Sequence, residues 1–361
     1  MRTAAVIGTG MVGTSVALAL SRHGVEVFLA DRDEGAAKTA ASLGGGQAME
    51  PPGQVDLAVI AVPPAHIAGV LADAQSRNLA HSYTDVASVK DGPRHAAAAL
   101  GIDQAAYIGG HPLAGREISG PLAGRADLFE GRPWVLTPTA ETSRETLNRA
   151  LELISLCGAV PVVMDAPEHD HAVALISHAP HLVSALMAAR LENASEDASR
   201  IAGPGLRDVI RIAAGDPGMW EEILTANASA VADVLEEFAF DLTGVVAALR
   251  ALGTQEADKH DAGRDALTDL LRRGNSGHAR IPGKHGAPRA VYAQVAVAIS
   301  DEPGGLARLF ATAGKAGVNI EDVRIEHSPG QQAGLVTMMV APEAAELFAA
   351  RLTERGWTVQ V

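Results

Sequence analysis

The sequence predicts an α/β protein in three parts: an N-terminal doubly wound parallel sheet, an all-helical second domain and a small C-terminal βαββαβ module. Short β-rich runs alternate with helical stretches up to residue 164, and strand signals are then sparse until about Leu252. Residues 290–361 return to a mixed pattern. The 361 residues are 47% hydrophobic but only 3% aromatic, which predicts an aliphatic core of helices packed on a sheet.

The first domain is predicted to span residues 1–164. Each β-rich run in it is followed by a segment with helical spacing, the rhythm of a parallel sheet with crossover helices. Two further runs, near residues 134 and 160, are predicted as outer strands. The predicted strands are Ala4–Ile7, Val25–Leu29, Leu57–Val62, Tyr83–Val86, Tyr107–Ile108, Trp134–Thr137 and Val160–Met164.

The second domain is predicted to span residues 165–273. Asp165, Pro167 and Glu168 match a helix N-cap with a capping-box acid, and the residues after them have a helical pattern. The stretch from Ala172 to Ala189 lacks Asp, Glu, Lys and Arg, but it contains two histidines and a proline, so we expect a buried core helix rather than a membrane span. Residues 274–289 are rich in Gly, Pro and basic residues and predict a linker or an ordered loop.

The third domain is predicted to span residues 290–361. After a strand over Val291–Ile299, four apolar residues follow helical spacing on one face: Leu306, Leu309, Phe310 and Ala313. The remaining elements are predicted as strands over Val318–Ile320 and Gly334–Val340, a helix over Ala344–Thr353 and a strand over Trp357–Val361.

Composition excludes several classes of protein. A formal net charge of −14 argues against a nucleic-acid partner, because phosphate neutralisation needs clustered cations. The single cysteine, Cys157, fits a reducing compartment, and a glycine-rich loop interrupts the apolar N-terminus, unlike a secretion signal. We therefore expect a cytoplasmic protein with no nucleic-acid or membrane partner.

A glycine motif follows the first predicted strand. Gly8, Gly10 and Gly13 form G-x-G-x-x-G at a strand-to-helix turn, which allows a tight turn and close approach of a pyrophosphate to the helix N-terminus. The next strand ends at Asp31, where a carboxylate can bind the ribose hydroxyls. Asp31 favours NAD over NADP, although Arg32 could accept a 2′-phosphate. The cofactor residues predicted for this Rossmann-type domain are Gly8, Gly10, Met11, Val12, Gly13, Asp31, Arg32, Val62 and Ser88.

Polar residues gather at the carboxyl ends of two later strands, where open α/β sheets bind ligands. One loop carries Ser88, which could also be a helix N-cap, and the other carries His111 before a proline. In the helical domain, His171, His178 and His181 share one helical face, but no carboxylate or cysteine joins them and we predict no metal. We expect His169 and His171 to be ordinary helix-end or core residues.

A pair of arginines lies one helical turn apart later in the helical domain. Arg207 has Asp208 as a neighbour and fits a solvated salt-bridged face. Arg211 is followed by apolar residues and is the better candidate for a buried carboxylate clamp.

Together these segments resemble the prephenate/arogenate dehydrogenase family of tyrosine biosynthesis. The resemblance rests on the glycine motif, Asp85-x-x-Ser88-Val89-Lys90, His111-Pro112-Leu113-Ala114-Gly115, Ser177-His178-Ala179-Pro180-His181, and Gly205 through Arg211 with Met219-Trp220. In addition, Asp301-x-Pro303-Gly304-x-Leu306 with Gly317-Val318-Asn319-Ile320 resembles an ACT domain, a module that commonly binds amino-acid effectors.

The resemblance implies NAD-dependent oxidative decarboxylation of prephenate to 4-hydroxyphenylpyruvate, or of arogenate to tyrosine. It implies that His111 accepts the substrate hydroxyl proton and that Ser88 bridges His111, substrate and nicotinamide. Arg211 would hold the ring carboxylate, His181 and Ser177 would line the substrate pocket, and Arg116 could reach the substrate side chain or the cofactor. The implied effector residues are Asp301, Gly304, Leu306, Asn319 and Ile320, with L-tyrosine as the expected effector.

Other assignments remain open. A different dehydrogenase acting on β-hydroxy acids commonly uses a catalytic lysine instead of a strand-end histidine. A non-catalytic NAD sensor with an amino-acid-binding module would leave His111, His181 and Arg211 without a role. A homodimer is expected by analogy with other Rossmann proteins that carry a helical second domain. The basic loop at residues 280–285 fits either a cover over a site or a plain linker.

Overall fold

A computed structural model of the chain describes residues 1–115, 119–254, 256–281, 292–300, 302–327 and 333–360. It separates into two compact units, Met1–Val246 and Ala247–Val361, which are described one at a time.

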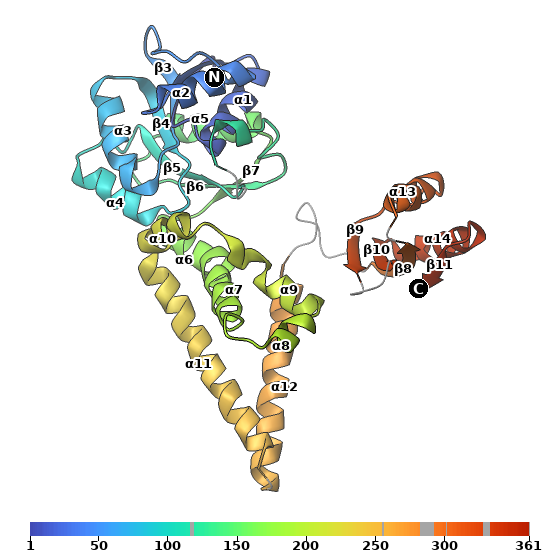
Figure 1. Cartoon of the computed structure of the whole chain (residues 1–361). Coiled ribbons are helices and arrows are strands. Elements are labelled where there is room, and N and C mark those ends of the chain that lie inside the picture. The colour runs from blue at the N-terminus through green and yellow to red at the C-terminus, as the bar shows by residue number, and fades with distance from the viewer. Residues whose placement is uncertain (116–118, 255, 282–291, 301, 328–332, 361) are drawn as a thin grey trace. The chain divides into compact units, whose positions relative to one another are not determined.

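The first unit begins with a seven-stranded sheet (Figure 1) of order β2-β1-β3-β4-β5-β6-β7. Every pair in it is parallel except β5 with β6, so the predicted parallel sheet becomes mixed at its outer edge. The strands are β1 (Thr3–Ile7), β2 (Glu26–Ala30), β3 (Val55–Ile60), β4 (Ala80–Asp85), β5 (Tyr107–Pro112), β6 (Pro133–Thr137) and β7 (Val160–Val163).

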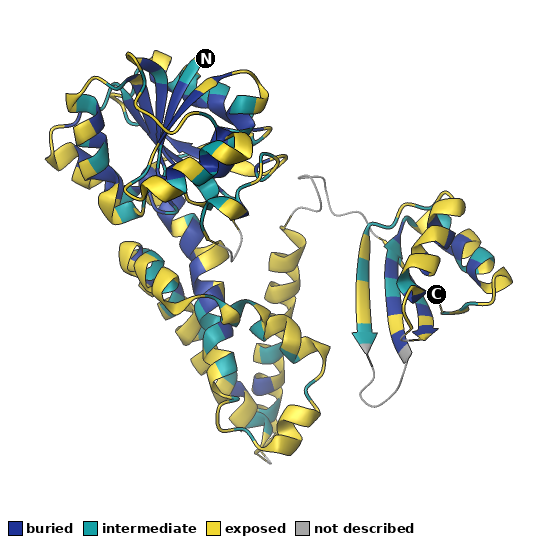
Figure 2. Ribbon diagram, turned by 45° about the horizontal axis from the view of Figure 1, so that its top comes forward, coloured by how far each residue is buried: buried dark blue, intermediate teal, exposed yellow. Residues whose placement is uncertain are grey.

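Helices cover both faces of this sheet, as the doubly wound prediction requires. Successive strand residues point to opposite faces, so Val27 and Leu29 join one core cluster while Phe28 joins the other. Helices α1 and α5 pack on the first face, and α3 and α4 pack on the second. Figure 2 shows the resulting buried sheet between partly exposed helices. The helices are α1 (Met11–Arg22), α2 (Glu34–Ala40), α3 (Ile67–Ser76), α4 (Asp91–Ala99) and α5 (Arg144–Leu156).

Beyond residue 164 the first unit is helical, as predicted. Asp165 caps α6, because its side chain accepts a hydrogen bond from the Glu168 backbone N–H at 2.8 Å. A π-helical turn, Ala174–His178, comes directly after α6. Pro180 follows this turn and has no N–H to donate to the carbonyl four residues earlier. The helices are α6 (Ala166–Val173), α7 (Ala179–Ala189), α8 (Glu196–Arg200), α9 (Pro204–Ile210), α10 (Pro217–Ala226) and α11 (Ala228–Leu252).

The run Ala166–Ala189 is, among the described residues, the one helical segment apolar and long enough to cross a membrane by length and composition. Core helices of soluble proteins pass the same test. Only 33% of its apolar window is buried, so the expected core helix is buried along one side only.

The second unit contains helix α12 and a four-stranded antiparallel sheet of order β11-β8-β10-β9. The predicted element order β-α-β-β-α-β is present, with Val295 and Val297 facing Leu309 and Phe348 in its core. The elements are α12 (Ala257–Ala279), β8 (Ala293–Ser300), α13 (Gly305–Lys315), β9 (Asp322–His327), β10 (Ala333–Val340), α14 (Pro342–Glu354) and β11 (Thr358–Gln360).

Two boundary predictions for this unit are wrong. The expected linker at 274–289 begins inside α12, which continues to Ala279. A glycine costs a helix only about 1 kcal/mol, so Gly274 and Gly277 do not end it. The expected strand Val318–Ile320 is irregular, and the strand is Asp322–His327 instead. Val318 and Ile320 still pack against the core, which explains their apolar character.

Candidate active site

The turn between β1 and α1 carries the glycine motif. Gly8 has a φ of +99°, and a Cβ there would lie 2.2 Å from the carbonyl oxygen of Ala61. A Cβ at Gly13 would lie 1.9 Å from the Gly8 carbonyl oxygen, whereas nothing lies within 4 Å of a Cβ built at Gly10. The turn therefore requires glycine at positions 8 and 13. The open space at Gly10 fits a pyrophosphate that approaches the first turn of α1.

Asp31 lies directly after β2 and is held in place by the same turn. Its Oδ2 accepts hydrogen bonds from the Thr9 backbone N–H at 2.6 Å and from Thr9 Oγ1 at 3.0 Å, and its Oδ1 accepts one from the Asp33 N–H at 2.9 Å. Partial burial raises the pKa of Asp31, but these hydrogen bonds and the charge of Arg32 outweigh it and lower the pKa. An ionised carboxylate here fits ribose hydroxyls and repels a 2′-phosphate.

A cavity of about 960 Å³ lies beside this turn and is of the size that small-molecule sites have. It brings together four of the predicted catalytic and substrate-binding residues from distant parts of the chain, namely Ser88, His111, Ser177 and His181. Met11 and Val12 of the glycine motif line the same cavity, so the nucleotide turn and the candidate catalytic histidine face one space. The rest of the lining is mainly apolar: Val86, Pro112, Leu113, Ala114, Gly115, Val173, Ile176, His178, Pro180, Ile212, Gly215, Met219, Trp220 and Ile223.

His111, the penultimate residue of β5, is joined to two residues of α6. Its Nδ1 lies 2.8 Å from Nε2 of His169, and His169 Nδ1 lies 2.7 Å from Oδ1 of Asp170. His169 is 1% exposed and Asp170 is 6% exposed. Burial lowers the pKa of His111 well below its ordinary value, and the positive charge of Lys90, like any second proton on His169 or His178, lowers it further. Burial thus favours the neutral form of His111, which is the form that can accept a proton.

His169 is a buried residue of α6, as expected, but it also contacts His111, which the sequence did not predict. The π-helical turn changes where the later histidines lie relative to it. In a regular helix, His169 would lie on roughly the opposite side from His178. The π turn Ala174–His178 adds a residue without advancing the helix, which rotates the residues after it by about 100°. His169, His178 and His181 are buried, whereas His171 is exposed.

Two other histidines of the cavity are held by specific neighbours. Nδ1 of His178 lies 3.2 Å from the Asn227 side-chain nitrogen, which also donates to the Asp170 carbonyl oxygen at 2.8 Å. The His181 ring stacks on Trp220 with centroids 3.5 Å apart and an angle of 10°. A Cβ at Gly215 would lie 2.4 Å from Trp220 Nε1, so only glycine lets the chain pass this stacked pair.

A buried ion pair supports the strand end that carries His111. Lys90 Nζ contacts Asp85 Oδ1 and donates to the Gly110 carbonyl oxygen at 2.6 Å. Asp85 Oδ2 accepts a hydrogen bond from the Tyr107 hydroxyl at 2.6 Å. Burial lowers the pKa of Lys90, and the charge of Asp85 opposes that shift. Lys90 is thus a buried support of the backbone next to His111.

Ser88 lines the cavity and is not the N-cap of the helix after it, so that alternative is wrong. Helix α4 begins at Asp91, and its N-terminal N–H groups bond to a carboxylate from another helix. The Lys90 N–H donates to Asp170 Oδ1 at 2.8 Å, and the Asp91 N–H donates to Asp170 Oδ2 at 2.9 Å. Asp170 therefore caps α4 and bonds to His169 at the same time.

The remaining predicted residues do not line the cavity. Arg211 is exposed in a short 3₁₀ turn, Arg211–Ala214, so the expectation of a buried clamp is wrong; its neighbour Ile212 is in the lining. Arg32 is exposed, and Val62 lies near Gly8. Arg116 is outside the described residues.

The predicted effector residues belong to the second unit. Gly304 caps α13 with a φ of +85°, and Asn319 donates a hydrogen bond from its side chain to Glu321. Leu306 and Ile320 pack against the core of this unit. Asp301 lies outside the described residues.

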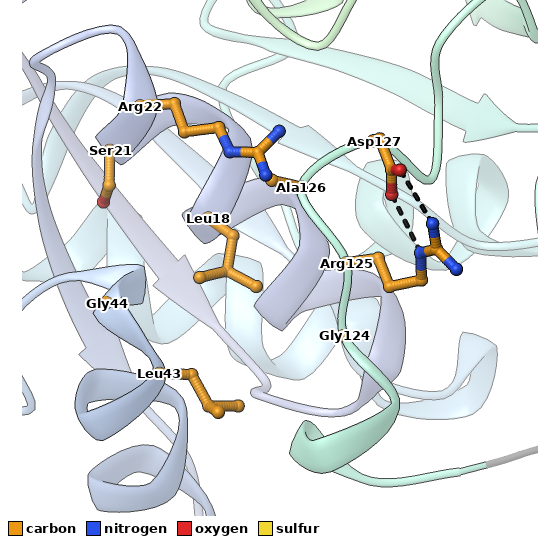
Figure 3. Close-up of a pocket in the computed structure, with 9 residues that line it drawn as sticks. All are labelled: Leu18, Ser21, Arg22, Leu43, Gly44, Gly124, Arg125, Ala126 and Asp127. Carbon is orange, nitrogen blue, oxygen red and sulfur yellow. Dashed lines mark hydrogen bonds and ion pairs between the residues drawn. The ribbon is translucent and has the colours of Figure 1, made fainter.

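A second hollow, of about 560 Å³, lies along the other end of α1 (Figure 3). It contains Leu18, Ser21 and Arg22 from α1, together with Arg125, which is paired with Asp127 through two contacts of 2.9 and 2.8 Å. None of the predicted site residues lines it. In the described part of the chain, no three His, Cys, Asp or Glu residues are grouped as metal ligands would be.

Comparisons with known proteins agree with this arrangement. The family model described as "Prephenate dehydrogenase, nucleotide-binding domain" matches residues 16–163, and "Prephenate dehydrogenase, dimerization domain" matches residues 165–263. The "Probable prephenate dehydrogenase NovF" of Streptomyces niveus is 44% identical over 360 residues, covering 99% of each chain.

Two solved structures are similar at 26% identity. The Synechocystis arogenate dehydrogenase gives a TM-score of 0.65 and covers 77% of this chain and 99% of its own. The prephenate dehydrogenase of A. aeolicus, in complex with hydroxyphenyl propionate and NAD+, gives a TM-score of 0.64 and covers 76% and 98%. With the glycine turn, the cavity and the two family models in agreement, the chain belongs to the prephenate dehydrogenase family and is an NAD-dependent dehydrogenase.

Proposed function

We propose that this enzyme catalyses the oxidative decarboxylation of prephenate to 4-hydroxyphenylpyruvate, in the synthesis of L-tyrosine. The observation that carries the proposal is the shared cavity: His111, a neutral base, and Met11 and Val12 of the nucleotide turn line the same space. A substrate in that space meets a proton acceptor and the cofactor together.

The reaction balances without a net proton. NAD, when bound, accepts the hydride from C4 of the substrate ring. His111 takes the C4 hydroxyl proton as the C4–O bond becomes a carbonyl. The bond to the ring carboxylate then breaks, CO2 leaves, and the bonding electrons complete an aromatic phenolate that takes a proton back. The prephenate dianion and NAD+ thereby give the 4-hydroxyphenylpyruvate anion, CO2 and NADH.

The other predicted residues receive roles within the same proposal. Ser88 bridges the substrate hydroxyl and the nicotinamide, and Ser177 and His181 line the ring pocket. Arg211, which precedes the lining residue Ile212 in the sequence, is proposed to bind the ring carboxylate. Arg116 is proposed to reach the substrate side chain.

Arogenate is the second candidate substrate, and the similarity to the Synechocystis arogenate dehydrogenase favours it. Prephenate and arogenate differ only in a keto or amino group on the side chain. The test is NADH formation at 340 nm with each substrate offered separately, with NAD and with NADP. Turnover of prephenate with NAD supports the proposal, and turnover of arogenate alone would replace the substrate. If neither prephenate nor arogenate is turned over while NAD still binds, the alternative of a non-catalytic NAD sensor would be favoured.

The second unit is proposed to be an ACT-like module that binds L-tyrosine and inhibits the enzyme. Its element order and antiparallel sheet support this, as does the turn at Gly304, which opens α13. Titration of tyrosine into wild type and an Asn319→Ala variant tests the proposal. Weaker inhibition of the variant is expected; equal inhibition would place the inhibitor elsewhere, such as the active site.

We also propose a cytoplasmic homodimer. The second family model is a dimerization domain, and helices α7 and α11 expose large apolar side chains. Leu186 is 59% exposed and Phe240 is 81% exposed, which is costly without a partner. Light scattering of wild type and a Phe240→Asp variant should give a dimer and a weakened dimer, whereas a monomeric wild type would exclude the proposal.

A further inference from the structure

Asp170, His169 and His111 are linked by two hydrogen bonds, and the donor and acceptor of each can be assigned by starting from Asp170. An ionised carboxylate has acceptors only, so the hydrogen between Asp170 and His169 lies on His169 Nδ1. When His169 carries a single hydrogen, on Nδ1, its Nε2 is an acceptor, and the hydrogen in the 2.8 Å contact lies on His111 Nδ1. This leaves Nε2 of His111 without a hydrogen, as the atom that can accept a proton.

His178 takes the opposite tautomer, with its hydrogen on Nε2. The Asn227 amide donates to the Asp170 carbonyl oxygen at 2.8 Å, which fixes its nitrogen on that side. That nitrogen lies 3.2 Å from His178 Nδ1, which must therefore accept. In neutral His178 the hydrogen lies on Nε2, and the ring lines the cavity.

We propose that Asp170 is a positioning residue that sets opposite tautomers on two cavity histidines, making His111 Nε2 a proton acceptor and His178 Nε2 a hydrogen-bond donor to an oxygen of the substrate. The Asp170 carboxylate sets the tautomer of His111 through His169. The Asp170 backbone carbonyl sets the tautomer of His178 through Asn227. The inference rests on the proposed role of His111, and it adds three residues, His169, Asp170 and Asn227, that do not touch the substrate.

The arrangement matches the proton balance of the reaction. When His111 takes the hydroxyl proton on Nε2, the new imidazolium still donates from Nδ1 to His169, and the Asp170 carboxylate ends the chain. The proton is returned to the phenolate, so no route to solvent is required. His169 is 1% exposed and Asp170 is 6% exposed, so they offer the proton no route to solvent. The positive charge therefore stays on His111 until the proton is returned to the phenolate.

The tautomers can be measured without turnover. Long-range ¹⁵N–¹H spectra of the full-length enzyme, with histidine labelled and His111 and His178 assigned by substitution, report which ring nitrogen carries the hydrogen. We expect hydrogen on Nδ1 of His111 and on Nε2 of His178. Hydrogen on Nε2 of His111, or on Nδ1 of His178, would overturn the proposal. An Asn227→Leu variant should remove the preference at His178 only.

Kinetics test the consequence for the reaction. His169→Leu removes the acceptor, and kcat should fall roughly 10²-fold with KM nearly unchanged. His169→Gln keeps an amide oxygen within reach of His111 and should recover most of that loss. His171→Leu is the matched control, because His171 is exposed two residues away on the same helix, and it should behave as wild type. NAD affinity checks that each variant is folded.

The outcomes separate this inference from the proposed function. A wild-type enzyme inactive toward prephenate and arogenate would refute the function, while the spectra would still decide the tautomers. An active enzyme in which folded His169→Leu keeps its kcat would refute the positioning role alone. Equal losses in His169→Leu and His169→Gln, with wild-type NAD affinity, would also refute it.

Discussion

Replacement of Lys90 should strongly destabilise the N-terminal sheet. Its side chain is 1% exposed and that of Asp85 is 0% exposed. Lys90→Met removes one partner of a buried ion pair, which typically costs about 3–5 kcal/mol because the other charge remains buried. It also leaves the Gly110 carbonyl oxygen without its donor.

The hydrogen bonds that Asp85 keeps in this variant limit the loss in the free energy of unfolding. The Tyr107 hydroxyl and the Ala87 N–H still donate to it, at 2.6 and 2.8 Å, so the carboxylate is not left bare. We therefore expect a loss of about 3–4 kcal/mol in the free energy of unfolding of this sheet. A Lys90→Met, Asp85→Asn double variant should recover part of that loss, because the buried charge is gone.

Trp134 reports the unfolding of this sheet, since it is fully buried in β6. Urea unfolding would be followed by its fluorescence, with the other two tryptophans, Trp220 and Trp357, replaced by Phe. Lys38→Met is the control: its pair with Glu34 has side chains 70% and 84% exposed and should contribute less than about 1 kcal/mol. If Lys90→Met and Lys38→Met shift the transition equally, the reasoning about the buried pair is refuted.

Three further predictions concern the site. His111→Ala should lower kcat by about 10²–10⁴-fold with NAD affinity kept. In wild type, the fall of kcat/KM on the acid side should lie below pH 6.5, because burial lowers the pKa of His111 and the neutral base persists to lower pH. A fall that begins above pH 7 would contradict this. Arg211→Ala should mainly raise KM, because the carboxylate it is proposed to bind loses its charge as CO2 forms, and a loss confined to kcat would contradict the clamp. Gly8→Ala should abolish detectable NAD binding by calorimetry, because a Cβ would lie 2.2 Å from the Ala61 carbonyl oxygen, and wild-type affinity would contradict the tight turn.

Much of the fold is readable from local pattern. The strands of the first domain, the Asp165 cap and the helical character of the second domain depend on residues close in sequence. The mispredicted elements are those whose structure depends on a neighbouring strand or helix that is distant in the sequence. Asp322–His327 alternates polar and apolar residues, as a half-buried edge strand does, while the apolar Val318 and Ile320 fill the core without being in a strand.

The site is predictable where a motif ties residue type to position. Ser88, His111, Ser177 and His181 do share one cavity. A regular helical wheel places His169 on the wrong side, and Asn227 gives no local signal, since its partners lie on α6 and the π turn. The apolar residues after Arg211 predict a buried side chain, yet the chain turns there into a 3₁₀ segment.

The π turn makes the cavity depend on chain length as well as on composition. Deleting one residue between Ala174 and Ser177 would keep every cavity histidine but turn His178 and His181 about 100° relative to His169. Such a deletion would remove no chemical group, yet it would separate the groups that the cavity brings together. The local irregularity is therefore a spacer whose length sets the angle between α6 and α7 side chains, and substitutions are tolerated there more readily than a change in the number of residues.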